Sequence, residues 1–319
     1  MNSEKLVRSP RGLVELGAFE EVFSIPQHYL NDHCFVRHDA LWHFFGIIGP
    51  VGKSCFDAGS EIAFAHAVSP DLRHWERRAD VLGITGLWPE TSHVYAPNIM
   101  EHAGRFYMLY TAVDETCSQR LCLATSTDLD QWERYAGNPV IVPSLAWARW
   151  PNAQDDHWGA CRDPHILRLE DGRFAAYWVA EVREPAGNEV TCIAASISDD
   201  LVHWQEIGPI FSMRAWDEPP TRAVESPCVV PKDGKYWLFF KHGWWTHVAC
   251  SANPLDFRDA APARLGFCHA AEVFPWEGAW WISHCSADPA DYMYRQSNRT
   301  RGLFLGHLDW PAGEYPRLL

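Results

Sequence analysis

Three acidic residues stand at the start of short apolar segments: Asp32 in "NDHCFV", Asp163 in "RDPHIL" and Glu225 in "ESPCVV". Carboxylates that are brought together raise one another's pKa. A set of carboxyl groups with separated pKa values is what the hydrolysis of an acetal requires, because one group protonates the leaving oxygen while another acts on the anomeric carbon. We therefore expect Glu225, which has the longer side chain, to be the acid, and Asp32 to be the base or nucleophile.

Asp163 follows Arg162 directly. We expect Asp163 to hold Glu225 in place and to set its pKa through a nearby negative charge. A single Asp in such a position often only accepts backbone N–H bonds in a turn. Three acidic residues at matching places along the chain favour a site over three independent turns.

The places match because the chain repeats one plan five times. Each copy has a polar or small start, a short apolar strand, a turn and an aromatic-rich strand, which is the signature of a β-hairpin. The copies are "DHCFVRHDALWHFFGI", "APNIMEHAGRFYMLYTA", "RDPHILRLEDGRFAAYWVA", "ESPCVVPKDGKYWLFFKHG" and "HAAEVFPWEGAWWISHCS", aligned on His33, Pro97, Pro164, Pro227 and Ala270. A second element follows three of them: "SPDLRHWE", "STDLDQWE" and "SDDLVHWQ". Five units of four strands predict an all-β, five-bladed β-propeller that forms a single domain over residues 1–319.

A propeller places the first strand of every blade beside the central channel, so equivalent residues of different blades converge there. Around the carboxylates we expect side chains that contact a carbohydrate, and Trp rings pack well against the apolar face of a sugar. The candidates are Arg162, Trp42, Tyr95, Trp158, His242 and His269. The Trp residues of the second element, Trp75, Trp132 and Trp204, are expected to be structural.

The net charge and the composition limit the classes of partner and the type of environment that we expect for the protein. The formal net charge of −14 repels nucleic acid phosphates and anionic membranes, so we expect neither as a partner. The first residues lack an apolar stretch of signal-peptide length, which predicts a cytoplasmic protein. The ten cysteines form no CxxC pair, and we expect them to be small buried hydrophobes rather than disulfides or zinc ligands. Composition leaves the oligomeric state open.

The chain resembles the five-bladed propeller glycoside hydrolases, the group that includes families 43, 32, 62 and 68, from about residue 28 to the C-terminus. The resemblance to family 43 is carried by "YAPNIMEHAGRFYMLYT", "RDPHILRLEDGRFAAYW", "ESPCVVPKDGKYWLFF", "CHAAEVFPWEGAWWISH" and the final "RGLFLGHLDWPAGEYPRL". It implies Asp32 as the base, Asp163 as the group that modulates a pKa and Glu225 as the acid. It also implies inversion at the anomeric carbon.

Blade one is closer to family 32. The segment "LNDHCFVRHDALWHFFG", followed by "FAHAVSPDLRHWE", resembles the "NDPNG" and "GHAVSxDLxHWE" motifs of that family. In family 32 the same Asp is a covalent nucleophile and the reaction proceeds with retention. Two features depart from that pattern: His33 and Cys34 replace the residues that follow the Asp in its motif, and the second β-sandwich domain of family 32 is not seen in this sequence.

These resemblances lead to one expected function and several rivals. We expect an exo-acting hydrolase of small glycosides, of the arabinofuranosidase or xylosidase type. The alternatives are a β-fructofuranosidase or fructosyltransferase of the family 32 type, a phosphorylase of a related mannoside family, and a non-catalytic sugar-binding propeller. No cofactor is expected to be required. The histidine that matches His269 in family 43 bears on a bound calcium through water, so calcium is left open at that residue, although a lone histidine supplies no ligand set.

Overall fold

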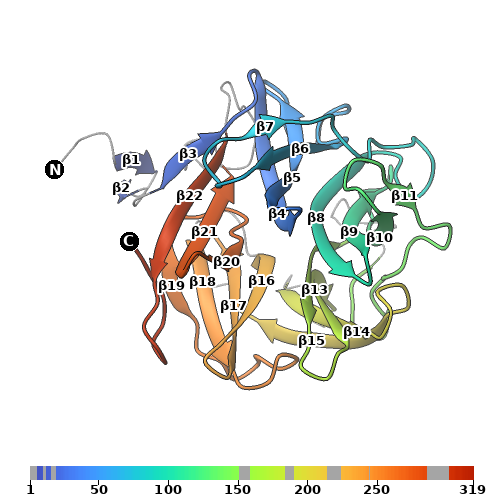
Figure 1. Cartoon of the computed structure of the whole chain (residues 1–319). Coiled ribbons are helices and arrows are strands. Elements are labelled where there is room, and N and C mark those ends of the chain that lie inside the picture. Colours follow the sequence, from blue (N-terminus) through green and yellow to red (C-terminus); the bar gives the residue numbers. More distant parts are fainter. Residues whose placement is uncertain are drawn as a thin grey trace.

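The computed structural model describes residues 6–9, 12–15, 19–150, 159–183, 190–213, 224–243, 245–285 and 302–319. These residues form β-strands and no helix, and five sheets stand around a common centre (Figure 1). The predicted all-β, five-bladed β-propeller is confirmed. Among the described residues, no helix is long and apolar enough to cross a membrane.

The blades follow one another along the chain. Blade one consists of β4 (His28–His38), β5 (Leu41–Pro50), β6 (Phe64–Ser69) and β7 (Glu76–Arg77). Blade two consists of β8 (His93–His102), β9 (Arg105–Val113), β10 (Gln119–Ser126) and β11 (Glu133–Arg134). Blade three consists of β12 (Cys161–Arg168), β13 (Phe174–Val182), β14 (Val190–Ser198) and β15 (Gln205–Ser212). Blade four consists of β16 (Val224–Lys232), β17 (Lys235–His242), β18 (Trp245–Ser251) and β19 (Ala263–Gly266).

Blade five joins the two ends of the ring. It consists of β20 (Val273–Trp276), β21 (Ala279–Cys285), β22 (Leu303–Asp309) and β23 (Arg317–Leu318). The early strand β3 (Glu20–Phe23) pairs antiparallel with β22 of this blade. A separate hairpin of β1 (Leu6–Ser9) and β2 (Gly12–Glu15) precedes β3. Because β3 precedes blade one along the chain, its pairing with β22 closes the ring with backbone hydrogen bonds.

The hydrophobic core is divided among the contacts between blades. Five apolar clusters each draw their residues mainly from two neighbouring blades, including the pair formed by blade five and blade one. A representative cluster between blades two and three contains Leu121, Trp178 and Leu201, all fully buried. Each sheet therefore buries both faces, which explains why the aromatic-rich strands carry little polar alternation.

The second repeated element is a turn with the same geometry in three blades. Its Leu is fully buried and has a positive φ, and its Trp Nε1 donates a hydrogen bond to the carbonyl of that Leu. The pairs are Leu72 with Trp75 at 2.9 Å, Leu129 with Trp132 at 3.0 Å, and Leu201 with Trp204 at 3.2 Å. These Trp residues are structural, as expected.

The innermost strand of four blades has a β-bulge at the same register. Two residues of the inner strand oppose a single residue of the next strand, and the pairing shifts between Leu30 and His33, Tyr95 and Asn98, Arg162 and His165, and Glu225 and Cys228. The first bulge residue has a positive φ in blades two, three and four, and the corresponding Ala270 of blade five does too. A bulge bends its strand and redirects side chains, so this register marks where the channel wall turns inward.

The bulge also explains the Pro of each repeat. The second bulge residue is Pro97, Pro164 or Pro227 in blades two to four, where the missing N–H costs no ladder hydrogen bond. In blade one this place is held by Asp32. The sequence alignment placed His33 and Ala270 with these Pro residues. The structure shifts both by one residue, because Asp32 holds the place in blade one and Ala270 matches the first bulge residue by its positive φ.

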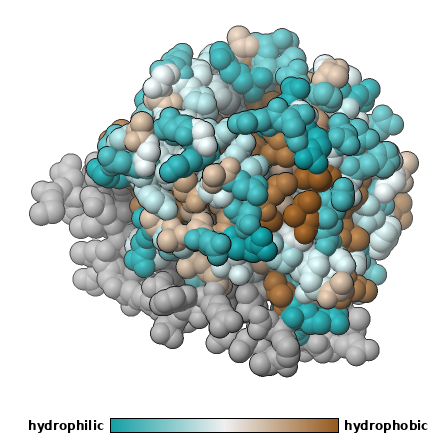
Figure 2. Space-filling model, turned by 90° about the horizontal axis from the view of Figure 1, so that it is seen from below, coloured by the Kyte–Doolittle hydropathy of each residue, from teal (hydrophilic) through white to brown (hydrophobic). Residues whose placement is uncertain are grey.

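The distribution of polar side chains on the surface and the burial of the cysteines are those of a folded protein. The face seen in Figure 2 is largely hydrophilic, with hydrophobic side chains gathered in one area between polar segments. All ten cysteines are free, and eight of them are buried, with Cys117 exposed and Cys250 partly exposed. The expectation of free, mostly buried cysteines is confirmed.

Replacing Leu201 by Ala should lower the free energy of unfolding by about 2–5 kcal/mol, because the side chain is fully buried between two blades and its loss leaves a cavity. Urea unfolding followed by Trp fluorescence measures this change. Ile207→Ala, at a position that is 43% exposed, is the matched control and should change stability by much less. Equal losses in the two variants would contradict the assigned packing.

Candidate active site

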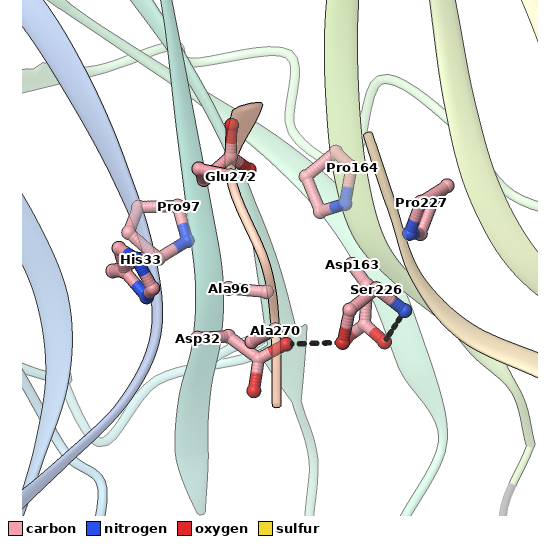
Figure 3. Close-up of a pocket in the computed structure, with 10 residues that line it drawn as sticks. All are labelled: Asp32, His33, Ala96, Pro97, Asp163, Pro164, Ser226, Pro227, Ala270 and Glu272. Carbon is pink, nitrogen blue, oxygen red and sulfur yellow. Dashed lines mark hydrogen bonds between the residues drawn. The ribbon is translucent and has the colours of Figure 1, made fainter. Parts of the chain in front are cut away.

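A pocket lies at the centre of the ring, and it is lined almost entirely by bulge residues. Figure 3 shows its ten lining residues, which come from all five blades: Asp32, His33, Ala96, Pro97, Asp163, Pro164, Ser226, Pro227, Ala270 and Glu272. Two of the three predicted acidic residues, Asp32 and Asp163, therefore line one pocket although 131 positions separate them along the chain.

Ser226 connects these two carboxylates. Its hydroxyl donates to Asp32 Oδ1 at 2.7 Å, and its backbone N–H donates to Asp163 Oδ2 at 3.1 Å (Figure 3). Ser226 is the first bulge residue of blade four and has a φ of 50°, so its N–H is freed from the strand ladder to reach Asp163. The serine holds both acids at fixed positions from a third blade.

Glu225 is held by two cations. Arg162 Nη2 donates to Glu225 Oε1 at 3.1 Å, and the Lys241 ammonium donates to Glu225 Oε2. Arg162 also lies 3.5 Å from Asp163 Oδ2 through Nε, and its Nη1 donates to Gln119 Oε1 at 3.4 Å. The guanidinium therefore stands between Asp163 and Glu225 and contacts both.

The buried charges shift the three pKa values in different directions. Burial and the neighbouring Asp32 raise the pKa of Asp163 from 3.8 to about 7, although Arg162 opposes the shift. Burial also raises the pKa of Asp32, with a further contribution from Glu225. Burial alone would raise the pKa of Glu225, but the charges of Lys241 and Arg162 outweigh it and hold the pKa at about 2.

This distribution differs from the sequence expectation. Asp163 was expected to set the pKa of Glu225 by its negative charge, whereas in the free protein two cations dominate Glu225 and keep it ionised. The sequence analysis missed Lys241. Without a bulge, hairpin counting from the pair Lys232 and Lys235 places His242 opposite Glu225, but the bulge shifts the pairing by one residue and brings Lys241 there instead.

His269 lies next to Asp32 on the blade-five side of the pocket. Its Nε2 is 2.8 Å from Asn31 Oδ1 and 3.8 Å from Asp32 Oδ2. Asn31 Nδ2 donates to Glu61 Oε1 at 3.3 Å, which leaves Asn31 Oδ1 as an acceptor and assigns the proton to His269 Nε2. Asn31 and Glu61 were not identified from the sequence, because neither stands in a repeated motif.

Of the remaining sequence candidates, two lie on the inner strands or next to them, one lies away from the pocket, and one is outside the described residues. Tyr95 stands just before the bulge of blade two, where Arg162 and Glu225 stand in blades three and four, and its hydroxyl donates to the Cys55 carbonyl at 3.3 Å. His242 is buried at the end of β17, opposite Val224. The structure does not bring Trp42 to the pocket, since it is buried at the other end of blade one against Phe274 and Trp276. Trp158 lies outside the described residues.

Comparison with known families and proteins gives one family match. A family model described as "Glycosyl hydrolases family 32 N-terminal domain" matches residues 23–261. The chain is 31% identical over 128 residues to the sucrose:sucrose 1-fructosyltransferase of Festuca arundinacea, covering 38% of this chain and 19% of that protein. It is 27% identical over 187 residues to the probable sucrose-6-phosphate hydrolase of Psychromonas ingrahamii, covering 57% of this chain and 30% of that protein. The alignments span less than a third of the length of either relative.

Solved structures match over nearly the whole chain. The GH43_1 enzyme from Xanthomonas citri complexed with xylose gives a TM-score of 0.69 at 14% identity, covering 94% of this chain and 92% of that one. An exo-1,5-alpha-L-arabinanase from a bovine ruminal metagenomic library gives a TM-score of 0.65 at 16% identity, covering 93% and 99%. At these identities the likeness shows a shared fold.

The raised pKa of Asp163 makes a prediction about stability and pH. At pH values between the ordinary pKa of 3.8 and the folded pKa of about 7, Asp163 binds a proton when the protein folds. The contribution of Asp163 to the free energy of unfolding therefore falls as the pH rises through that interval. Asp163→Asn removes the titrating group and keeps an oxygen acceptor, and Asn tolerates the positive φ of 54°. At pH 8 the variant should be more stable than the wild type by on the order of 2–4 kcal/mol.

Unfolding in denaturant at pH 4 and pH 8 tests this expectation, and the gain should shrink toward zero at pH 4. The exposed Asp259→Asn is the control, and it should track the wild type at both pH values. An Asp163→Asn variant less stable than the wild type at pH 8 would show that Asp163 is held as a carboxylate.

Proposed function

The chain belongs to the glycosyl hydrolases of family 32, because it matches the model of that family's N-terminal domain, and from this premise we propose that it hydrolyses a β-fructofuranosyl bond in a small carbohydrate. We propose that the reaction proceeds with retention at the anomeric carbon. The family match covers the strands that carry all three carboxylates and their partners Arg162, Ser226 and Lys241. It favours the fructofuranosidase alternative over the arabinofuranosidase or xylosidase type expected from the sequence motifs. The structural likeness to family 43 proteins supports the shared fold and carries no preference for their substrates.

The observation that carries the proposal is the convergence of Asp32, Asp163 and Glu225 on one channel end, where Ser226 joins the first two and Arg162 joins the last two. In the proposed reaction Asp32, although burial raises its pKa in the free protein, attacks the anomeric carbon in its carboxylate form while Glu225 protonates the leaving oxygen. Water then attacks the glycosyl–Asp32 ester, and Glu225 takes the proton of that water. Ser226 supports the role of Asp32, because its hydroxyl occupies Oδ1 and leaves Oδ2 to face the substrate.

Glu225 needs a proton before it can act as the acid. It rests ionised between Lys241 and Arg162, so we propose that the leaving group displaces part of this pairing when substrate binds. Asp163, with a pKa of about 7, holds a proton in the same cluster near neutral pH and can supply it. Arg162 would then stay on Asp163 as the proton moves, which keeps the cluster's charge balanced.

We also propose a cytoplasmic location for the protein. The support is chemical: ten cysteines are free and unpaired, which is usual for a reducing compartment. Small phosphorylated or unphosphorylated sucrose-like compounds are then the class of substrate to test first.

The stereochemical course and the two acid variants test the function together. With sucrose or a short fructan, proton NMR of the first sugar released should show the retained anomer. Glu225→Gln should slow the hydrolysis of poor leaving groups by ~10²–10⁴ and spare activated aryl fructosides far more, while Asp32→Asn should abolish turnover of both. Release of the inverted anomer from an aryl arabinofuranoside or xyloside, with no action on fructosides, would return the assignment to the family 43 type. Specific sugar binding without any turnover would make the chain a binding module.

Lys241 provides a separate test through the pH profile. Lys241→Met removes the cation that most lowers the pKa of Glu225. The cluster of Asp163 and Glu225 should then hold its proton to higher pH, and the basic limb of the kcat/KM profile should move to higher pH by ~1–3 units. Lys235→Met, at the exposed far end of the same strand, is the matched control and should leave the profile in place. A Lys241→Met profile with lower activity and an unmoved basic limb would remove Glu225 as the titrating acid.

A further inference from the structure

A second ring of side chains lies one position further along the inner strands. It consists of the first residue after each bulge: His33, Asn98, His165 and Cys228 in blades one to four. Glu272 holds the corresponding place in blade five, directly before β20. Four of the five are buried and Glu272 is nearly so, with 18% of its side chain exposed. This ring is not used by the reaction proposed above.

Three members of this ring present one metal-binding atom each at the same point. A ring nitrogen of His165, the Cys228 Sγ and a carboxylate oxygen of Glu272 all lie within 4.8 Å of one another. They come from blades three, four and five, which are neighbours in space. We propose that His165, Cys228 and Glu272 bind one divalent transition-metal ion of the zinc class, which departs, for Cys228, from the sequence expectation that no cysteine is a zinc ligand.

The hydrogen bonds around the histidine support this proposal. His165 Nε2 lies 3.1 Å from the Val229 carbonyl, which can only accept, so Nε2 carries the proton and Nδ1 presents its lone pair. Nδ1 faces Glu272 Oε2 at 3.8 Å, which sets two electron-pair donors toward each other. Asn98 Nδ2 donates a long hydrogen bond of 3.5 Å to Nδ1, and a bound ion would replace this bond. A histidine that ligates a metal typically gives its other N–H to a backbone carbonyl in this way.

The cysteine is oriented in a comparable manner. Cys228 Sγ accepts a hydrogen bond from the Val273 N–H at 3.4 Å. Burial and the neighbouring Glu272 raise the pKa of this thiol in the free protein, so a bound ion would take the place of the thiol proton. The donor set is one nitrogen, one sulfur and one oxygen, which suits Zn²⁺ or Co²⁺ and not Ca²⁺, whose ligands are oxygens. The site therefore differs in residues and in chemistry from a calcium ion near His269.

The pocket gives the ion a route and an open position. Glu272 lines the same pocket as Asp32 and Asp163 (Figure 3), so an ion that enters the channel reaches the carboxylate first. Three protein ligands leave the fourth tetrahedral position for water. Because the ligands belong to three blades, the bound ion would link them and stabilise the folded ring by mass action.

Metal titration of the full chain tests the proposal. Chelator-treated, reduced protein should bind one Zn²⁺ per chain in isothermal titration calorimetry, and its midpoint of thermal unfolding should rise with added Zn²⁺. Co²⁺ should produce a near-ultraviolet thiolate charge-transfer band, and Cys228→Ser should abolish that band. Glu272→Gln should keep the band and weaken Zn²⁺ affinity by at least ~10-fold.

Cys192→Ser is the matched control, since Cys192 is fully buried in β14 and outside the cluster, and it should bind both ions as the wild type does. Circular dichroism checks that each variant is folded, and Glu272→Gln serves if Cys228→Ser does not fold. Absence of stoichiometric Zn²⁺ binding to the wild type would overturn the proposal, as would a cobalt band that survives Cys228→Ser. These readouts do not involve sugar hydrolysis, so they stand or fall separately from the proposed function.

Discussion

Three carboxyl groups buried within one channel end require compensation, and the arrangement of the site follows from how that compensation is supplied. An unpaired carboxylate in such surroundings is costly, and three together would each shift toward the neutral form. Arg162 and Lys241 neutralise Glu225, and Arg162 reaches Asp163 as well. Asp32 accepts the hydroxyl of Ser226 and lies 3.8 Å from His269, and the charge of Lys241 acts on it without a direct ion pair among the described residues. The charges are therefore shared unequally, and the unequal sharing separates the pKa values of groups that are chemically alike.

The β-bulge allows blades of similar sequence to place different charged and polar residues around the three acids. It gives blades one to four a pair of residues outside the strand ladder at the same height in the channel, so each of these blades can change those residues without disturbing its strand pairing. Blade three uses the place for an acid and Pro164, blade four for Ser226 and Pro227, and blade one for Asn31 and Asp32. The repeats share their backbone here and differ in their chemistry.

The sequence predicted the architecture well because hairpins and turns leave local signals. The five repeats, the buried Leu and Trp of the second element, and the approach of Asp32 and Asp163 all depend on patterns within one blade or on the symmetry of the ring. Lys241 could not be found in this way, because its position opposite Glu225 depends on the one-residue shift in strand pairing at the bulge, and no local sequence pattern indicates that shift. Trp42 was misplaced for a related reason, since strand direction puts it at the opposite end of the blade from Asp32. The pKa differences among Asp32, Asp163 and Glu225 depend on contacts between blades, so they cannot be predicted from single motifs.

The pairing of β3 with β22 has a consequence for how the protein is made. Residues 20–23 and 303–305 are paired as antiparallel strands, so this pairing cannot form before the chain has been made as far as residue 305. Contacts between residues so far apart in sequence form slowly. Until then the ring is open and the pocket lacks the wall that blade five provides through Ala270 and Glu272. A chain that stops before blade five would consequently carry its acidic residues without the enclosure that gives them their properties.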